Sequence, residues 1–225
     1  QLDELKNHLF ANISHELRTP VTLMLGPLEQ LARSNHLSPQ QSAMIRLAEN
    51  NGRHMLELIQ QILDLGKLES GKMTVEESPV VLAGFLRDCT ASFADHAQNI
   101  GIRLEWRNSI HPEMAVWMDT RKVETILKNL LSNAMKYTAP GGKVTVTTTD
   151  SREHLCIEVS DTGRGIAPAD LPRIFDRYYQ SVGKNAPAEG GAGLGLAICQ
   201  EMSRLIGGQL TAESEIGKGS TFRFV

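Results

Sequence analysis

The sequence has little net charge and no long apolar run. Its 225 residues include 23 lysines and arginines against 26 aspartates and glutamates, a balance that excludes a polycationic arm, so we expect no nucleic-acid partner. No apolar stretch approaches the roughly 18 residues that a membrane helix needs. Apolar residues still make up 41% of the chain, which is enough for packed cores. We therefore expect this stretch of chain to be soluble.

Cysteines are few, and two familiar cysteine- and nucleotide-binding patterns are missing. Cys89, Cys156 and Cys199 are odd in number, widely spaced and outside any Cys-x-x-Cys pair. This spacing excludes a disulfide framework and a structural zinc site, and it favours a reducing compartment. No Gly-x4-Gly-Lys-Ser/Thr loop is present, and the run 217–220 misses that spacing, so a P-loop nucleotide site is excluded.

The first third of the chain has the periodicity of a helical hairpin. Apolar residues recur every three or four positions from Leu2 to Leu31 and again from Met44 to Leu65, and a polar stretch separates the two runs. Two such helices cover only part of each other's apolar stripes. We therefore expect residues 1–70 to form an all-α hairpin that pairs with a second copy, giving a homodimeric four-helix bundle.

A second domain is expected over residues 74–225, after a linker near 67–75. Its helical and β-rich segments do not alternate strictly, which favours an α+β sandwich with a mixed sheet covered on one face over a Rossmann sheet. The chain is thus predicted to be multidomain. The expected strands lie near 73–81, 102–106, 114–118, 143–149, 154–160, 208–214 and 220–225, and the expected helices near 82–99, 120–137 and 193–206.

One histidine on the first helix stands out from the other six. His15 lies two residues from both Ile13 and Leu17, so its side chain should face away from the apolar seam. A neutral imidazole is a nucleophile, and the adjacent Glu16 can accept one ring N–H and fix the tautomer. The other histidines are interpreted as solvated surface residues.

Two later segments contain residues suited to a metal-bound nucleotide. Asn129 and Asn133 share one face of a predicted helix, where amide oxygens are acceptable ligands for Mg²⁺ beside phosphate oxygens. Lys136 follows and can neutralise phosphate charge, with Tyr137 beside it. After a predicted strand, the carboxylate of Asp161 can accept the exocyclic amine of adenine. Three further glycine positions at a helix start suit phosphate binding, namely Gly191, Gly193 and Gly195.

These segments resemble the motifs of sensor histidine kinases. Residues 10–20 resemble the phosphoacceptor box, residues 127–137 the N box, and residues 174–180 the F box. The order of Asn box, Asp-x-Gly-x-Gly loop, F box and glycine loop resembles the Bergerat ATP-binding fold, shared with Hsp90-like chaperones, type II topoisomerases and mismatch-repair ATPases. Within the F box, Phe175 and Tyr178 are expected to be packing residues, and residues 181–190 read as a lid.

The resemblance implies roles for individual residues. His15 would be phosphorylated with Glu16 as general base, and Asn133 with Asn129 would bind magnesium. Thr19 would contribute to phosphatase activity, or it would be an ordinary surface threonine. Lys136 would contact phosphate, and Tyr137 would contact the adenine or the ribose. The other positions implied for ATP binding are Asp161, Gly163, Gly165, Gly191, Gly193 and Gly195. Many relatives carry a basic residue where Gln180 stands, and Arg177 or Lys184 could supply that contact instead.

The function implied is ATP- and Mg²⁺-dependent autophosphorylation of the histidine, followed by transfer to an aspartate on a response-regulator receiver domain. The chain would be the cytoplasmic core of a longer, inner-membrane sensor. Two alternatives stay open. One is an ATPase of the wider Bergerat group, in which a glutamate that activates water stands where this chain has Asn129; the other is a catalytically inactive dimeric scaffold.

Overall fold

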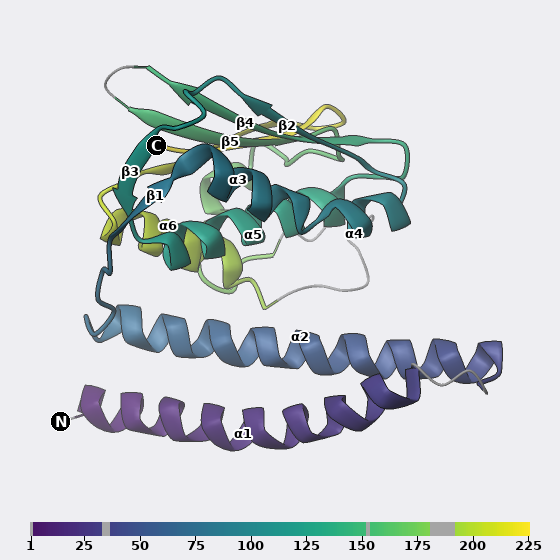
Figure 1. Cartoon of the computed structure of the whole chain (residues 1–225). Helices are drawn as coiled ribbons and strands as arrows, with labels where there is room; N and C mark the ends of the chain where they lie inside the picture. The colour runs from purple at the N-terminus through teal and green to yellow at the C-terminus, as the bar shows by residue number, and fades with distance from the viewer. Residues whose placement is uncertain (1, 33–36, 152–153, 181–191) are drawn as a thin grey trace. The chain divides into compact units, whose positions relative to one another are not determined.

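The computed structural model describes the backbone of residues 2–32, 37–151, 154–180 and 192–225, and side chains from Leu17 onward within those ranges. The chain divides into two compact units, Gln1–Thr74 and Val75–Val225 (Figure 1). Each is described separately below. In the part of the chain that the structure describes, no helix is both long enough and apolar enough to cross a membrane.

The first unit is a pair of long helices, α1 (Leu2–Ala32) and α2 (Pro39–Glu69). The start of α2 is defined by a capping box in which the Ser38 hydroxyl accepts the Gln41 N–H while the Gln41 side chain accepts the Ser38 N–H. Pro39 then occupies the first turn, where its missing N–H costs little. The helical hairpin expected from periodicity is confirmed, and α1 continues as a helix through Pro20 and Pro27.

The two helices bury only a narrow seam between them. Val21 and Leu25 of α1 and Ile59 and Leu65 of α2 are buried, and a Cβ on Gly52 would lie 2.7 Å from Leu25 Cδ2, so the helices approach closely there. Many large apolar side chains of this unit remain exposed, among them Leu17, Leu23, Met24, Leu31, Met44, Leu47, Met55 and Ile62. The hairpin therefore leaves a substantial apolar surface uncovered in one copy of the chain.

The second unit contains a five-stranded mixed sheet and a separate two-stranded ribbon. In the large sheet the order is β2-β4-β5-β7-β6, with β2 and β4 parallel and the other neighbours antiparallel. Its strands are β2 (Arg103–Asn108), β4 (Lys143–Asp150), β5 (Leu155–Asp161), β6 (Leu210–Glu215) and β7 (Gly219–Phe224). The ribbon pairs β1 (Ser78–Val81) with β3 (Ala115–Met118).

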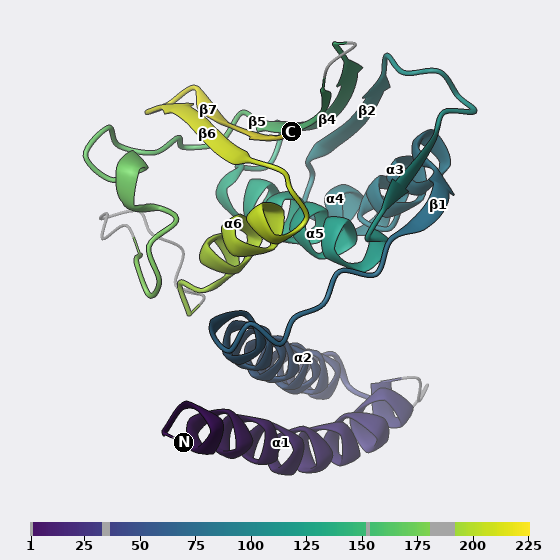
Figure 2. The ribbon, with the colours of Figure 1, turned by 90° about the vertical axis from the view of Figure 1, so that its left-hand side faces the viewer.

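Helices cover one face of the large sheet (Figure 2). They are α3 (Leu82–Ala91), α4 (Ala94–Asn99), α5 (Thr120–Tyr137) and α6 (Gly195–Leu205), with a short 3-10 turn η1 (Leu171–Arg173). The core between the layers includes Val144, Val146 and Val159 from the strands and Leu130 and Ile198 from the helices. The opposite face is polar, and there Arg223 forms ion pairs with Glu158 and Glu213. The mixed sheet covered on one face is thus confirmed.

Asp119 connects the start of this unit to the start of α5. Its carboxylate caps the helix by accepting the Lys122 N–H at 3.1 Å, and it also accepts the Glu76 N–H at 2.9 Å. Burial alone would raise the pKa of Asp119, but these N–H groups and the Lys122 ammonium outweigh it and hold that pKa below its usual value. The carboxylate is therefore a fixed, ionised anchor within the unit.

Two expected elements differ from the structure. The single helix expected near 82–99 is wrong, because α3 ends at Ala91 and α4 begins at Ala94. The Ser92 hydroxyl donates to the Cys89 carbonyl at 2.7 Å, a local side-chain bond that competes with continued helix. The strand expected near 73–81 is shorter than predicted, because only Ser78–Val81 pair with β3.

Candidate nucleotide-binding site and phosphoacceptor helix

Helix α5 presents the two predicted amides on its partly exposed side. Buried residues such as Ile126, Leu130 and Ala134 hold the helix against the core, which leaves Asn129 and Asn133 half-buried. The Asn129 amide nitrogen donates to the Thr125 carbonyl at 3.0 Å. The amide oxygen carries the lone pairs of this side chain, so it is the atom that can meet a cation.

Asp161 lies at the end of β5 in a nearly enclosed position. Asp161 is 9% exposed, and one of its carboxylate oxygens accepts the Gly163 N–H at 2.7 Å. Burial raises the pKa of Asp161, while the N–H groups of Gly163 and Ser220 oppose that rise. A buried carboxylate whose orientation is fixed by backbone donors is suited to recognise a hydrogen-bond donor on a ligand.

The glycines after Asp161 are required by close backbone contacts. A Cβ on Gly163 would lie 2.3 Å from the Tyr137 carbonyl oxygen, and a Cβ on Gly165, whose φ is +70°, would lie 2.1 Å from the Glu215 carbonyl oxygen. Neither position can hold a side chain without moving the backbone. The loop is therefore packed against both the end of α5 and the end of β6.

The Asp161 loop and the end of α5 meet at Tyr137. The Arg164 N–H donates to the Tyr137 carbonyl at 3.2 Å, and the Arg164 guanidinium carbon lies 4.6 Å from the centre of the Tyr137 ring. The Lys136 ammonium is 5.5 Å from the same centre. Two sequence motifs separated by some twenty-five residues along the chain are thereby joined into one site.

Arg164 is the site residue that sequence analysis missed. The signal for it was its position between Gly163 and Gly165, where a short turn has to project the intervening side chain. The sequence did not reveal that this side chain would lie over Tyr137, because that contact depends on how β5 and α5 pack.

The glycine loop precedes α6 as predicted. Gly193 accepts the Tyr178 N–H at 2.9 Å, Leu194 is buried, and Gly195 is the first residue of α6. The side chain of Leu194 makes no capping hydrogen bond, so the first-turn N–H groups are not satisfied by that residue. Gly191 and Lys184 lie outside the described residues.

In the F-box segment, the packing prediction holds for one aromatic residue and not for another. Phe175 is half-buried, but Tyr178 is 69% exposed, so its assignment as a packing residue is wrong. Its φ of 62° turns the chain so that the next residue packs instead. The Tyr179 hydroxyl donates to Asp170 at 2.7 Å, and its ring lies 4.3 Å from the Arg173 guanidinium. Gln180 and Arg177 are exposed.

The predicted phosphoacceptor lies within α1. The backbone of His15 and Glu16 is helical, but their side chains, including the predicted outward orientation of His15, lie outside the described residues. Thr19, one turn further on, is exposed. Next to Thr19 in the sequence, Arg18 of α1 donates to the Gln60 side chain of α2 at 2.8 Å, in an exposed contact between the two helices.

Comparison with known families assigns both units to one class of signalling enzyme. Residues 5–71 match the family described as "His Kinase A (phospho-acceptor) domain". Residues 118–225 match the family described as "Histidine kinase-, DNA gyrase B-, and HSP90-like ATPase". The chain therefore belongs to the sensor histidine kinases, the protein-histidine kinases that join a dimerisation domain to an ATPase-like domain.

Individual relatives agree with this family. The chain is 30% identical to "Histidine kinase P4" of Formosa agariphila, over 99% of this chain and 16% of that protein. It is 29% identical to "Sensor protein SrrB" of Staphylococcus aureus, over 98% of this chain and 38% of that protein. The chain thus spans well under half the length of these curated relatives.

Solved structures show the same fold. Full-length ShkA, crystallised in complex with AMPPNP, is 30% identical to the chain, with a TM-score of 0.76 over 96% of this chain and 45% of that one. The histidine kinase AdeS of Acinetobacter baumannii is 21% identical, with a TM-score of 0.64 over 93% of this chain and 95% of that one. The likeness to AdeS concerns the fold alone.

Proposed function

We propose that the chain is an ATP-dependent autokinase core that phosphorylates His15 and passes the phosphoryl group to an aspartate on a response-regulator receiver domain. The observation that carries this proposal is the junction at Tyr137, where the Asn-bearing helix α5 and the Asp161 loop meet through the 3.2 Å bond from Arg164. A nucleotide placed there would reach Asp161 with its base and the asparagine side with its phosphates.

The residues present suit Mg²⁺-ATP. Asp161 is a buried, oriented acceptor for the adenine amine, and Gly163, whose N–H binds that carboxylate, lets the loop pack closely against Tyr137. Asn129 and Asn133 offer amide oxygens that would hold Mg²⁺, and Lys136 would balance phosphate charge. Bound Mg²⁺ neutralises charge on the transferring phosphoryl group. Among the described residues no cluster of histidine, cysteine, aspartate and glutamate forms an alternative metal site.

In the proposed reaction, one imidazole nitrogen of His15 attacks the γ-phosphorus. A phosphorus–nitrogen bond forms, the bond from the γ-phosphorus to the bridging oxygen breaks, and ADP leaves with that electron pair. Glu16 takes the proton from the other ring nitrogen, acting as a general base. Positioning and charge neutralisation account for most of the rate of phosphoryl transfers of this kind.

Radiolabelling with γ-labelled ATP tests this proposal. We expect acid-labile, alkali-stable label on the wild type and none on His15→Gln, with His8→Gln, a change on the same helix, as the matched control. Asn133→Ala should lose label together with nucleotide binding. Label that survives His15→Gln would refute the assignment.

The same assay separates the two alternatives. An ATPase of the wider group needs a base where this chain has Asn129, and an amide cannot accept a proton from water. Rapid release of free phosphate without label on His15 would favour that ATPase. Failure of the wild type to bind ATP would favour an inactive scaffold.

We also propose a homodimer, because the apolar side chains left exposed on α1 and α2 would be covered by a second copy. A receiver domain would then approach the exposed surface near Thr19, whose hydroxyl is the proposed contributor to phosphatase activity. The proposed whole protein is longer than this chain and anchored to the inner membrane, with the present chain on the cytoplasmic side.

A further inference from the structure

The Asp161 carboxylate is oriented from two sides by different segments of the chain. The Gly163 N–H, in the loop that follows β5, donates to it at 2.7 Å. The Ser220 N–H, at the start of β7, donates to the same carboxylate. A Cβ on Gly219 would collide with the Asp161 carbonyl oxygen, so β7 begins directly against this residue. The direction of the carboxylate therefore depends on the spacing between the loop and the start of β7.

One side chain outside the sequence motifs connects these two segments. Ser214, in β6, accepts the Ile166 N–H from the loop at 2.8 Å. The Ser214 hydroxyl also donates to the Gly219 carbonyl at 2.8 Å, and the Ser220 hydroxyl oxygen lies 3.0 Å from it. Ser214 is thus bonded both to the loop and to the start of β7.

These three contacts use the whole hydrogen-bonding capacity of the Ser214 hydroxyl. A hydroxyl has one hydrogen to donate and two lone pairs that accept. Because the Gly219 carbonyl takes the hydrogen, the Ile166 N–H and the Ser220 O–H occupy the two lone pairs. No bonding capacity is left over, so the position of Ser214 is well determined relative to both segments.

A backbone bond accompanies the contacts of Ser214. In the turn between β6 and β7, the Gly217 N–H donates to the Arg164 carbonyl at 2.8 Å. The strands β6 and β7 are themselves paired along their length. A change at Ser214 would therefore remove the alignment that its hydroxyl provides, while the turn would still be held against the loop.

We propose that Ser214 is a positioning residue for recognition of the nucleotide base. By holding the loop and the start of β7 at a fixed spacing, its hydroxyl keeps the Asp161 carboxylate directed at the exocyclic amine of adenine. This inference rests on the function proposed above, because it concerns the same site. Hypoxanthine has a carbonyl where adenine has the amine, and a carboxylate held in place would meet an acceptor there instead of a donor.

Binding of ADP and IDP tests this role without phosphoryl transfer. The two nucleotides carry the same phosphates, so the ratio of their dissociation constants reports recognition of the base. By titration calorimetry with Mg²⁺, the wild type should bind ADP about tenfold more tightly than IDP. Ser214→Ala should weaken ADP about tenfold and leave IDP nearly unchanged, because only adenine gains from the direction of the carboxylate.

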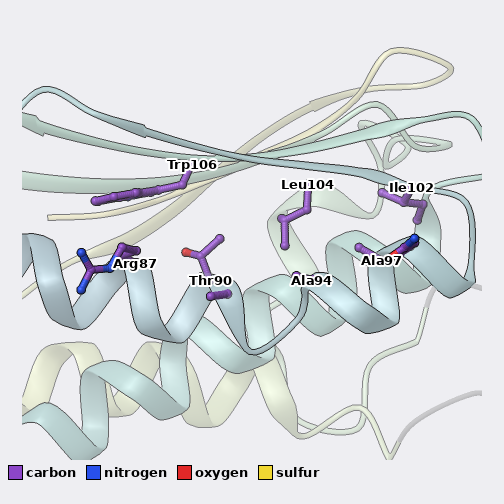
Figure 3. A pocket seen from close by; sticks show the side chains of 9 residues that line it. Arg87, Thr90, Ala94, Ala97, Ile102, Leu104 and Trp106 are labelled. Atoms are coloured by element: carbon purple, nitrogen blue, oxygen red, sulfur yellow. The ribbon is translucent and has the colours of Figure 1, made fainter.

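Two controls remove a hydroxyl elsewhere in the same unit. Ser160→Ala changes the residue next to Asp161, but the Ser160 side chain bonds to Glu158 and Thr221 on the polar face of the sheet. Thr90→Val changes a buried hydroxyl in the hollow between α3, α4 and β2 (Figure 3), which is lined by none of the residues assigned to the nucleotide. Both variants should keep the wild-type ratio.

A second variant covers the case in which Ser214→Ala does not fold. Ser214→Cys has a similar shape, but its thiol is a weak donor and acceptor, so it should lose the preference for ADP as well. Thermal melts by circular dichroism show which variants are folded.

The possible results separate this inference from the proposed function. A folded Ser214→Ala or Ser214→Cys that keeps the wild-type preference for ADP overturns the inference and leaves the proposed function standing. An equal loss of ADP and IDP binding in these variants also overturns it, because the effect would not concern the base. A wild type that binds neither nucleotide refutes the proposed function and this inference with it.

Discussion

Arg164→Met tests whether Arg164 acts on nucleotide binding through the Tyr137 ring. The guanidinium lies 4.6 Å from the ring centre, and both residues are half-buried. A cation–π contact of this kind contributes about 1 kcal/mol, between the exposed and the desolvated cases. Methionine retains much of the side-chain length and removes the charge, so we expect roughly fivefold weaker ATP binding by titration calorimetry.

The choice of ligand distinguishes positioning from direct phosphate binding. If Arg164 holds Tyr137 against the base or ribose, Arg164→Met should weaken the binding of adenosine and the binding of ATP by the same factor. If Arg164 instead bound phosphate, ATP would lose affinity and adenosine would not. Arg164→Lys keeps a charge that can lie over the ring, and it should restore most of the affinity.

A double-mutant cycle gives the decisive measurement. Because the proposed effect passes through the ring, Arg164→Met should have little further effect in a Tyr137→Leu background, with a coupling energy of about 1 kcal/mol. Additive losses in the cycle, or a loss confined to ATP, would refute the reasoning. Thermal melts of the apo variants would show whether each variant retains the stability of the wild type.

Three further changes test the site and the core of the second unit. Asp161→Asn should weaken ATP binding yet stabilise the apo protein near neutral pH. Burial raises the folded-state pKa of Asp161, so the wild type loses stability as the pH rises from the unfolded-state pKa of about 4 through the folded-state pKa. The difference in Tm between the variant and the wild type should therefore disappear in acid. Gly163→Ala should destabilise the protein by about 1–3 kcal/mol and abolish ATP binding, because its Cβ would clash with the Tyr137 carbonyl. Gly84→Ala, in α3 with nothing within 4 Å of the added carbon, should instead stabilise the protein by about 0.5–1 kcal/mol. Equal melting temperatures for the two variants would contradict both expectations. Thr148→Val should raise the free energy of unfolding by about 1 kcal/mol in urea titrations, because the Thr148 hydroxyl is buried without a partner among the described residues, and a loss of stability would show that the hydroxyl is satisfied.

Local patterns predicted the elements well where a single periodicity runs uninterrupted. The helix expected near 120–137 matches α5 at both ends, because its apolar face and its Asp119 cap are encoded within one short segment. The same reasoning failed near Ser92, where a single side-chain hydrogen bond ends α3. Binary patterning does not report such bonds.

Contacts between distant segments were beyond sequence reasoning. The motif residues were located by resemblance, but the placement of Arg164 over Tyr137 depends on the packing of β5 beside α5. Tyr178 and Tyr179 are adjacent and chemically alike, yet one is exposed and the other contacts Asp170. The difference comes from the positive φ at Tyr178, which no local signal indicated.

The Asp119 anchor has a mechanical consequence. Because the Glu76 N–H is bound by the residue that also caps α5, a displacement of the backbone at Glu76 would pull on the carboxylate that holds the first turn of this helix. The cap at Asp119 therefore makes the position of the first turn of α5 dependent on the backbone at Glu76.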